Sequence, residues 1–121
     1  MESSKRNRLI SGENGTGHWR WQRASALLLI PLSLWLIVSF SNVVYSEYDQ
    51  SLAWVSAPLV GCLLGLTVVS LLFHGHLGIV VIIDDYVRGP WRKRASQISA
   101  ILTTTTGLCV IVAIVSLFIT K

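Results

Sequence analysis

Three long apolar runs dominate this sequence and limit what it can fold into. They cover residues 24–44, 52–83 and 98–119, and each has at least the roughly 20 residues that a helix needs to cross a bilayer core of about 30 Å. The second run is longer than one span requires, so its helix is expected to tilt or to extend past the membrane surface. Only 13% of the residues are charged and 52% are hydrophobic, whereas a soluble domain of this size needs far more charge to cover its surface. The sequence predicts an all-α membrane protein with three transmembrane helices and no soluble catalytic domain.

The segments between the runs are polar and short. Residues 1–23 form a cytoplasmic or interfacial N-terminal segment, which is expected to be flexible up to residue 17. Trp19 and Trp21 alternate with basic residues at its end, as in the aromatic belt that settles at the headgroup level. A short acidic loop at 45–51 is predicted on the periplasmic side, and a basic loop at 84–97 on the cytoplasmic side.

The distribution of positive charge predicts the orientation in the membrane. Of the ten Lys and Arg residues, five precede the first run, four lie in the loop after the second run, and only Lys121 lies beyond the third. Because cytoplasmic loops carry an excess of Lys and Arg, the N-terminus and the 84–97 loop are predicted in the cytoplasm. The acidic loop and the C-terminus are then predicted on the outer, periplasmic side.

Two histidines, His74 and His76, lie within the second apolar run, where ionisable groups are costly and therefore candidates for function. His74 precedes Asp85 by eleven residues, which is about 16 Å along a helix and close to three full turns. His74 and Asp85 should therefore share one face, with His74 near the bilayer midplane. His76 should point to roughly the opposite side, so the two histidines cannot both ligate one iron. His74 needs a hydrogen-bond partner on another helix, or a metal.

Small residues accompany His74 on its predicted face. Ser70 and Gly78 lie four residues before and after it, and small residues at such positions let another helix or a flat ligand come close. A separate GxxxG pair, Gly61 and Gly65, predicts tight packing nearer the outer end of the same helix.

An acid and a phenol, Asp85 and Tyr86, stand at the predicted cytoplasmic end of the second helix. A phenol hydroxyl can bind a quinone carbonyl while a carboxylate or its waters supply protons, so the pair suits quinone reduction. An acidic helix end followed by an interfacial tyrosine is the alternative interpretation, and the pair alone does not decide between them.

Taken together, these residues resemble a known signature. The segment HGHLGIVVIIDDYVR is similar to the H-x-x-x-G-x-x-x-x-x-x-D-Y motif of the D-type hydrophobic membrane anchor of bacterial succinate dehydrogenase, respiratory complex II. The segment GHWRWQRASALLLIPLSLW resembles that family's entry into its first helix, G-x-x-H-x-x-x-Q-R-x-[ST]-A. The resemblance covers residues 15–45 and 70–90; the third run matches only in hydropathy.

The resemblance implies a heterotetramer of a flavoprotein, an iron–sulfur protein and two membrane anchors that share one haem b. His74 falls on the family's haem ligand, and the second ligand would come from the C-type anchor. Asp85 and Tyr86 fall on its ubiquinone site, and Arg23 falls on an arginine near the haem propionates and the quinone pocket. His76 and Asp84 fall at positions where the family varies.

The resemblance also implies where the protein works and with what. It would be a multi-pass protein of the bacterial inner membrane and a subunit that does not bind succinate itself; nucleic acid is not an expected partner. Glu2 and Glu13 interrupt the basic N-terminal stretch, which favours a bacterial over a mitochondrial inner membrane. Two alternatives are a C-type or fumarate reductase anchor and a structural membrane subunit without a cofactor. Val81 stands where C-type anchors usually have a second histidine, and Asp85-Tyr86 is the D-type feature.

Overall fold

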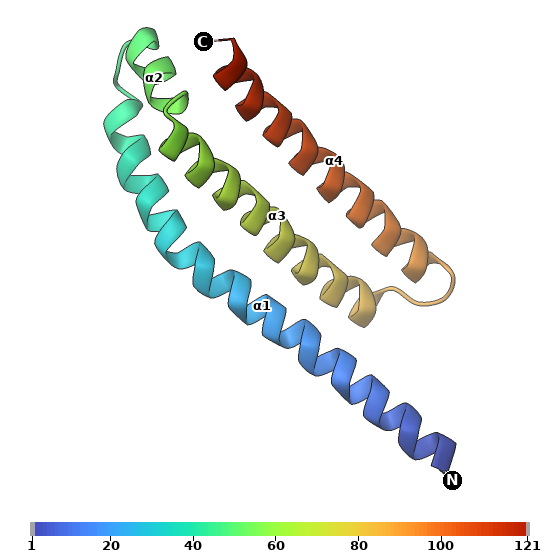
Figure 1. Cartoon of the computed structure of the whole chain (residues 1–121). Coiled ribbons are helices and arrows are strands. Elements are labelled where there is room, and N and C mark those ends of the chain that lie inside the picture. The colour runs from blue at the N-terminus through green and yellow to red at the C-terminus, as the bar shows by residue number, and fades with distance from the viewer. Residues whose placement is uncertain (1, 121) are drawn as a thin grey trace.

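A computed structural model describes the backbone of residues 2–120 and the side chains of residues 19–120, which form four helices (Figure 1). Three helices contain segments that are long and apolar enough to cross a membrane, which confirms the predicted all-α fold with three spans. The helices are α1 (Glu2–Val43), α2 (Tyr48–Val55), α3 (Pro58–Tyr86) and α4 (Trp91–Ile119). The candidate spans are Trp19–Val43, Pro58–Tyr86 and Trp91–Ile119.

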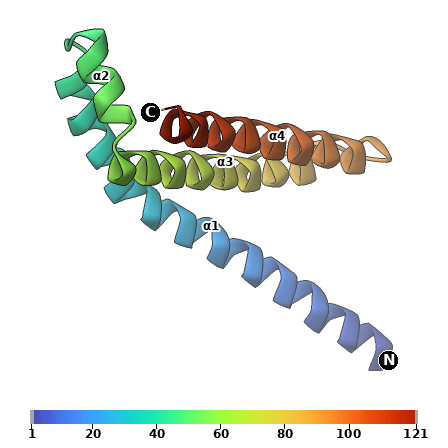
Figure 2. The same cartoon turned by 45° about the horizontal axis from the view of Figure 1, so that its top comes forward.

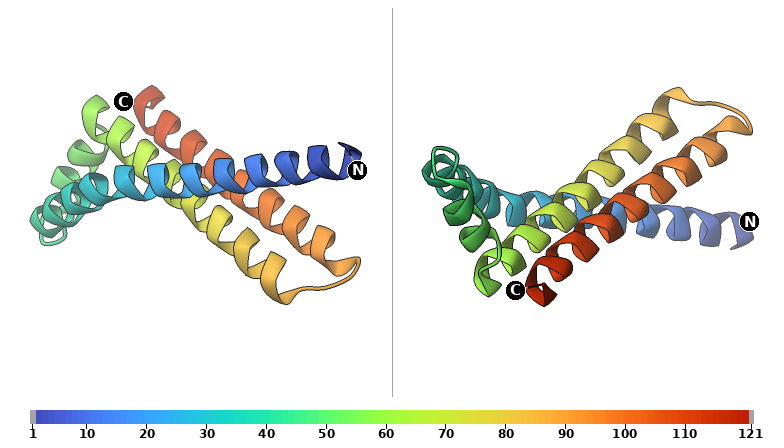
Figure 3. Two further views of the ribbon diagram at one scale, coloured as in Figure 1. Left: turned by 90° about the horizontal axis from the view of Figure 1, so that it is seen from below. Right: turned by 90° about the horizontal axis from the view of Figure 1, so that it is seen from above.

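Helix α3 is the centre of the fold, because it packs against both α1 and α4. The beginning of α1 and the connection between α3 and α4 lie toward one end of the molecule, and α2 and the end of α4 lie at the other (Figure 1). Helix α1 crosses the α3–α4 pair at an angle, and its first turns run away from them (Figures 2 and 3). The segments predicted to be cytoplasmic therefore share one end, while the side of the membrane on which that end lies stays a prediction.

The N-terminal segment differs from the flexible lead expected for residues 1–17. Helix α1 begins at Glu2 and continues without a break into the apolar span. Once a helix is nucleated, each added residue gains one hydrogen bond, and no proline interrupts the helix before Pro31. Pro31 itself is tolerated within a membrane helix. The side chains of the early basic residues Lys5, Arg6 and Arg8 lie outside the described ones.

The second apolar run is not one helix over 52–83 as predicted. It is divided between α2 and α3, and the break comes at Ser56 and Ala57, just before Pro58. Proline has no N–H to donate and its ring disfavours helical backbone in the preceding residue, so it suits the first position of a helix. Ala57 has the extended backbone expected there, with φ −66° and ψ 131°. Helix α3 ends at Tyr86, and its 29 residues measure about 43 Å, enough to span with some tilt.

The cytoplasmic loop predicted over 84–97 is shorter in the structure, with only residues 87–90 between α3 and α4. Gly89 takes a φ of 76°, which glycine adopts without the strain that a side chain would add, and this lets the chain reverse sharply. Across the turn, Arg92 Nε donates to Asp84 Oδ1 at 2.9 Å, and both side chains are about half exposed.

The helices pack through few and mostly small buried residues. The buried apolar residues of the described part are Leu29, Leu32, Leu77 and Ile83, and the buried polar ones are Ser25, Ser56, Thr67, Ser70 and Ser99. Small hydroxyl side chains at helix contacts are typical of membrane helices, since they let two backbones approach closely. Most large apolar side chains are exposed, and none of the apolar window of α4 is buried. This surface is suited to lipid or to neighbouring membrane subunits.

Candidate functional site

His74 faces α1 of the same chain. Its Nδ1 lies 2.9 Å from the hydroxyl oxygen of Ser25, a buried residue on α1. The same hydroxyl donates to the backbone carbonyl of Gln22, also at 2.9 Å. The imidazole itself is only partly buried, so one part of the ring stays accessible from outside the chain.

The two hydrogen bonds of Ser25 together fix which ring nitrogen of His74 carries the proton. A serine hydroxyl has one hydrogen to donate, and here that hydrogen goes to the Gln22 carbonyl. Both short contacts are satisfied only if Ser25 Oγ accepts from His74 Nδ1–H. A neutral imidazole with a proton on Nδ1 has its lone pair on Nε2, which is then the nitrogen free to bind a metal or accept a proton.

Gly78 continues the same contact one turn further along α3. A Cβ added at Gly78 would meet the Gln22 side-chain nitrogen at 3.8 Å, so this glycine also faces α1. The face of α3 that includes His74 and Gly78, where another helix or a flat ligand was expected to come close, thus lies partly against α1 of the same chain. The Oε1 atom of Gln22 is buried and has no hydrogen-bond partner among the described residues. Because an unsatisfied buried acceptor costs about 1–3 kcal/mol, a donor from outside the described residues is expected at this point.

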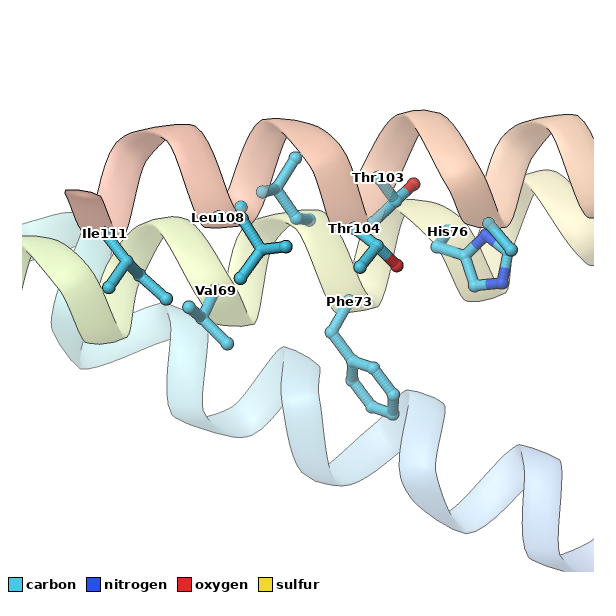
Figure 4. Close-up of a pocket in the computed structure, with 10 residues that line it drawn as sticks. Val69, Phe73, His76, Thr103, Thr104, Leu108 and Ile111 are labelled. Atoms are coloured by element: carbon cyan, nitrogen blue, oxygen red, sulfur yellow. The ribbon is translucent and has the colours of Figure 1, made fainter. Parts of the chain in front are cut away.

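His76 faces the opposite neighbour, as its spacing from His74 predicts. Its Nδ1 lies 3.0 Å from the hydroxyl of Ser99 on α4. It lines a mostly apolar pocket of about 300 Å³ between α3 and α4, where Phe73, Thr103 and Thr104 also contribute (Figure 4). The two histidines therefore contact different helices, and the structure agrees that they cannot ligate one iron together.

Asp85 and Tyr86 lie at the end of α3, far from His74 along the same helix. Tyr86 is the last helical residue, twelve positions after His74, which corresponds to about 18 Å of rise. Its side chain is 82% exposed, and Asp85 is exposed beside it. The structure therefore leaves the phenol open to a ligand or to a neighbouring subunit, and it does not bring the phenol into contact with the imidazole.

Two arginines each lie over the ring of a tryptophan on their own helix. The guanidinium of Arg23 lies 5.1 Å from the ring centre of Trp19 on α1, and Arg94 lies 5.3 Å from that of Trp91 on α4. Arg23 is exposed, and none of its recorded contacts is with His74, Asp85 or Tyr86. Its predicted role at a propionate or quinone therefore depends on groups outside this chain.

Sequence reasoning did not single out Ser25, Gln22 and Ser99, which hold the two histidines in place. Ser25 and Gln22 both stand in the quoted entry motif Q-R-x-[ST], and only Arg23 was selected from it. The Q-R-x-[ST] motif could have identified Ser25 and Gln22, because a histidine within the membrane needs a buried polar partner on a neighbouring helix.

Comparison with known proteins decides the family. Residues 3–120 match the family described as succinate dehydrogenase/fumarate reductase transmembrane subunit. The chain belongs to this family. The resemblance seen in the two sequence motifs is thereby confirmed.

Relatives in this family include proteins called succinate dehydrogenase hydrophobic membrane anchor subunit. One from Rickettsia bellii is 31% identical over 64% of this chain and 62% of its own length, less than two thirds. One from Rickettsia conorii is 28% identical over 89% of this chain and 85% of its own length. A succinate dehydrogenase membrane anchor subunit of Reclinomonas americana is 30% identical over 66% of this chain and 69% of its own length. No solved structure matches the chain significantly.

The donor set around His74 fits a haem iron better than an ion held by protein alone. Within the described residues, no three His, Cys, Asp or Glu side chains are placed to hold a metal ion together. A lone imidazole suits an iron that already has four porphyrin nitrogens and needs only axial ligands. The exposed part of the ring, and an Nε2 with no recorded hydrogen bond within the described residues, are compatible with such a group, so the residues present fit a haem.

Proposed function

We propose that this chain, a multi-pass, non-catalytic subunit of a membrane enzyme complex in the bacterial inner membrane, is the D-type anchor of a succinate:ubiquinone oxidoreductase. In this role it ligates haem b through His74, forms part of the quinone-reduction site with Asp85 and Tyr86, and docks the iron–sulfur and flavoprotein subunits. The observation that carries the proposal is a membrane imidazole that contacts Ser25 through Nδ1 and has no recorded Nε2 hydrogen bond within the described residues, on the same helix as an exposed acid–phenol pair.

His74 would hold haem b through its imidazole, together with a residue of the C-type anchor. Haem transfers single electrons, which is the chemistry that the group supplies when bound. On this chain, Ser25 would hold the imidazole against α1, and Gly78 lets α1 pack closely one turn further along α3. The buried Oε1 of Gln22 would accept a hydrogen bond from a donor on the partner anchor.

The exposed end of α3 would form one wall of the quinone site. Reduction of a quinone takes two electrons and two protons, and the electrons would arrive from the iron–sulfur subunit. The Tyr86 hydroxyl would donate to a quinone carbonyl oxygen and hold the ring in place. Asp85 would relay protons from cytoplasmic water to the two oxygens as they gain charge. Arg23 would pair with an anionic group, a haem propionate or the reduced quinone oxygen, through charge-assisted hydrogen bonds.

The soluble subunits would dock at the end that holds Tyr86, Trp91 and Arg94. This end is predicted to be cytoplasmic because nine of the ten Lys and Arg residues lie in the segments assigned to it. The short 87–90 connection and the half-exposed Asp84–Arg92 pair leave a compact polar surface there for a protein partner.

Purification in a mild detergent tests this proposal. The tagged chain should co-purify with a flavin-bearing and an iron–sulfur subunit and with a second small membrane protein, all identified by mass spectrometry. The preparation should show a reduced b-type haem absorbance band and reduce ubiquinone with succinate. Isolation of the chain without haem and without these partners, from cells grown on succinate, would refute the proposed function.

A further inference from the structure

Ser25 lies beside the proposed haem ligand on the neighbouring helix α1. Ser25 is buried on α1, and its hydroxyl lies 2.9 Å from His74 Nδ1 and 2.9 Å from the Gln22 carbonyl. We propose that Ser25 is a positioning residue for the haem: it orients the His74 ring, keeps the proton on Nδ1 and thereby presents Nε2 to the iron. This inference rests on the proposed function.

The Gln22 carbonyl restricts Ser25 to the role of hydrogen-bond acceptor toward His74. A serine without another contact can rotate its hydrogen and serve a histidine as donor or as acceptor. Here the hydrogen is committed to the carbonyl three residues earlier, so the oxygen can only accept from His74. The hydroxyl thus excludes the tautomer in which Nδ1 has the lone pair and Nε2 is blocked by a proton.

The hydrogen bond between Ser25 and His74 should also lower the midpoint potential of the haem iron, besides orienting the imidazole. In a histidine that binds a metal, a hydrogen bond donated by the other ring nitrogen raises the basicity of the coordinating nitrogen. Loss of the acceptor of that hydrogen bond typically changes metal affinity 10- to 100-fold. A more basic ligand stabilises ferric over ferrous iron. Loss of the Ser25 acceptor should therefore raise the haem midpoint potential, and a tenfold weaker preference for ferric iron corresponds to an upward shift of about 59 mV.

The test compares three variants of the intact complex. Ser25→Ala removes the acceptor, Ser25→Thr keeps it, and Ser99→Ala removes the equivalent bond from His76 on the other face of α3. Ser99 is the matched control, because it too is a buried serine bonded to a histidine Nδ1 across a helix contact. Each complex is measured for haem per flavin, for its optical spectrum and for the haem midpoint potential.

We expect Ser25→Ala to lower haem retention or raise the potential, while Ser25→Thr and Ser99→Ala behave as the unsubstituted complex does. A haem-containing Ser25→Ala complex with an unchanged spectrum and potential would overturn the positioning role and leave the proposed function intact. An equal change in Ser99→Ala would overturn it as well. Absence of haem from the unsubstituted complex would refute the proposed function itself.

A variant that does not assemble also gives a result. If Ser25→Ala yields no complex, Ser25→Cys fills the site with a thiol whose sulfur is a weak acceptor, and it should reproduce the shift in potential. An unchanged potential in Ser25→Cys would contradict the proposal. If neither variant assembles, Ser25 acts on folding rather than on the ligand, and the positioning role is overturned.

Discussion

Removal of a single hydroxyl from Tyr86 should separate quinone chemistry from assembly. The side chain is 82% exposed at the last position of α3, and no hydrogen bond to its hydroxyl is recorded within the described residues. Exposed substitutions away from special features usually change stability by about 0.5 kcal/mol or less. Tyr86→Phe should therefore leave folding and subunit assembly unchanged.

The effect on quinone reduction should be much larger than the effect on stability. Loss of one hydrogen bond to a quinone carbonyl costs about 0.5–1.5 kcal/mol, which corresponds to about a 2- to 13-fold fall in kcat/KM for the quinone. If the hydroxyl also transfers a proton during reduction, the fall should reach about 100-fold or more. Oxidation of succinate with an artificial dye that bypasses the membrane site should not change.

The assay measures both activities on one preparation, and the ratio of quinone to dye reduction is the readout. Tyr45→Phe is a matched control, because Tyr45 is 94% exposed in the turn before α2, at the opposite end of the molecule. A parallel fall in both activities of Tyr86→Phe would show that the residue supports assembly. An equal effect of Tyr45→Phe, or no effect of Tyr86→Phe, would refute the assignment of the phenol to the quinone.

Two further predictions concern packing and charge. A Cβ at Gly61 would lie 2.9 Å from Phe118 Cε2 and closer still to Cζ of the same ring, so Gly61→Val should destabilise the α3–α4 contact by about 1–3 kcal/mol. Gly75→Val is the control, since a Cβ there meets no atom within 4 Å, and equal losses of thermal stability in detergent would contradict the packing. Arg92→Ala removes a half-exposed ion pair with Asp84 and should cost only about 0.2–1 kcal/mol. That difference should shrink in high salt, and a larger, salt-independent loss of thermal stability would show that Arg92 has another role.

The number of spans could be predicted from the sequence, whereas the ends of the helices could not. Apolar length alone decides whether a segment can cross a bilayer, and it predicted three crossings correctly. Hydropathy does not distinguish a lipid-crossing helix from a short apolar helix beside it, so residues 52–55 were assigned to the second span. The signal that separates α2 from α3 is Pro58, a backbone constraint that an average of hydropathy ignores.

The opposed directions of the two histidines could also be predicted, because the helical period depends on the chain alone. A separation of two residues turns the side chain by about 200°, and the structure has His74 on Ser25 and His76 on Ser99. The identity of these partners could not be predicted in the same way. It depends on how α1 and α4 cross α3, and several serines on each helix were equally good candidates until that register was known.

The haem content of histidine variants tests the central claim most directly. His74→Ala and His76→Ala are each purified in the full complex, and b-type haem absorbance is measured per flavin. The account predicts that His74→Ala loses the haem or changes its spectrum, whereas His76→Ala, which only breaks a bond to Ser99, retains a normal haem. A normal haem in His74→Ala, or an equal loss in both variants, would contradict the assignment of His74 as the ligand.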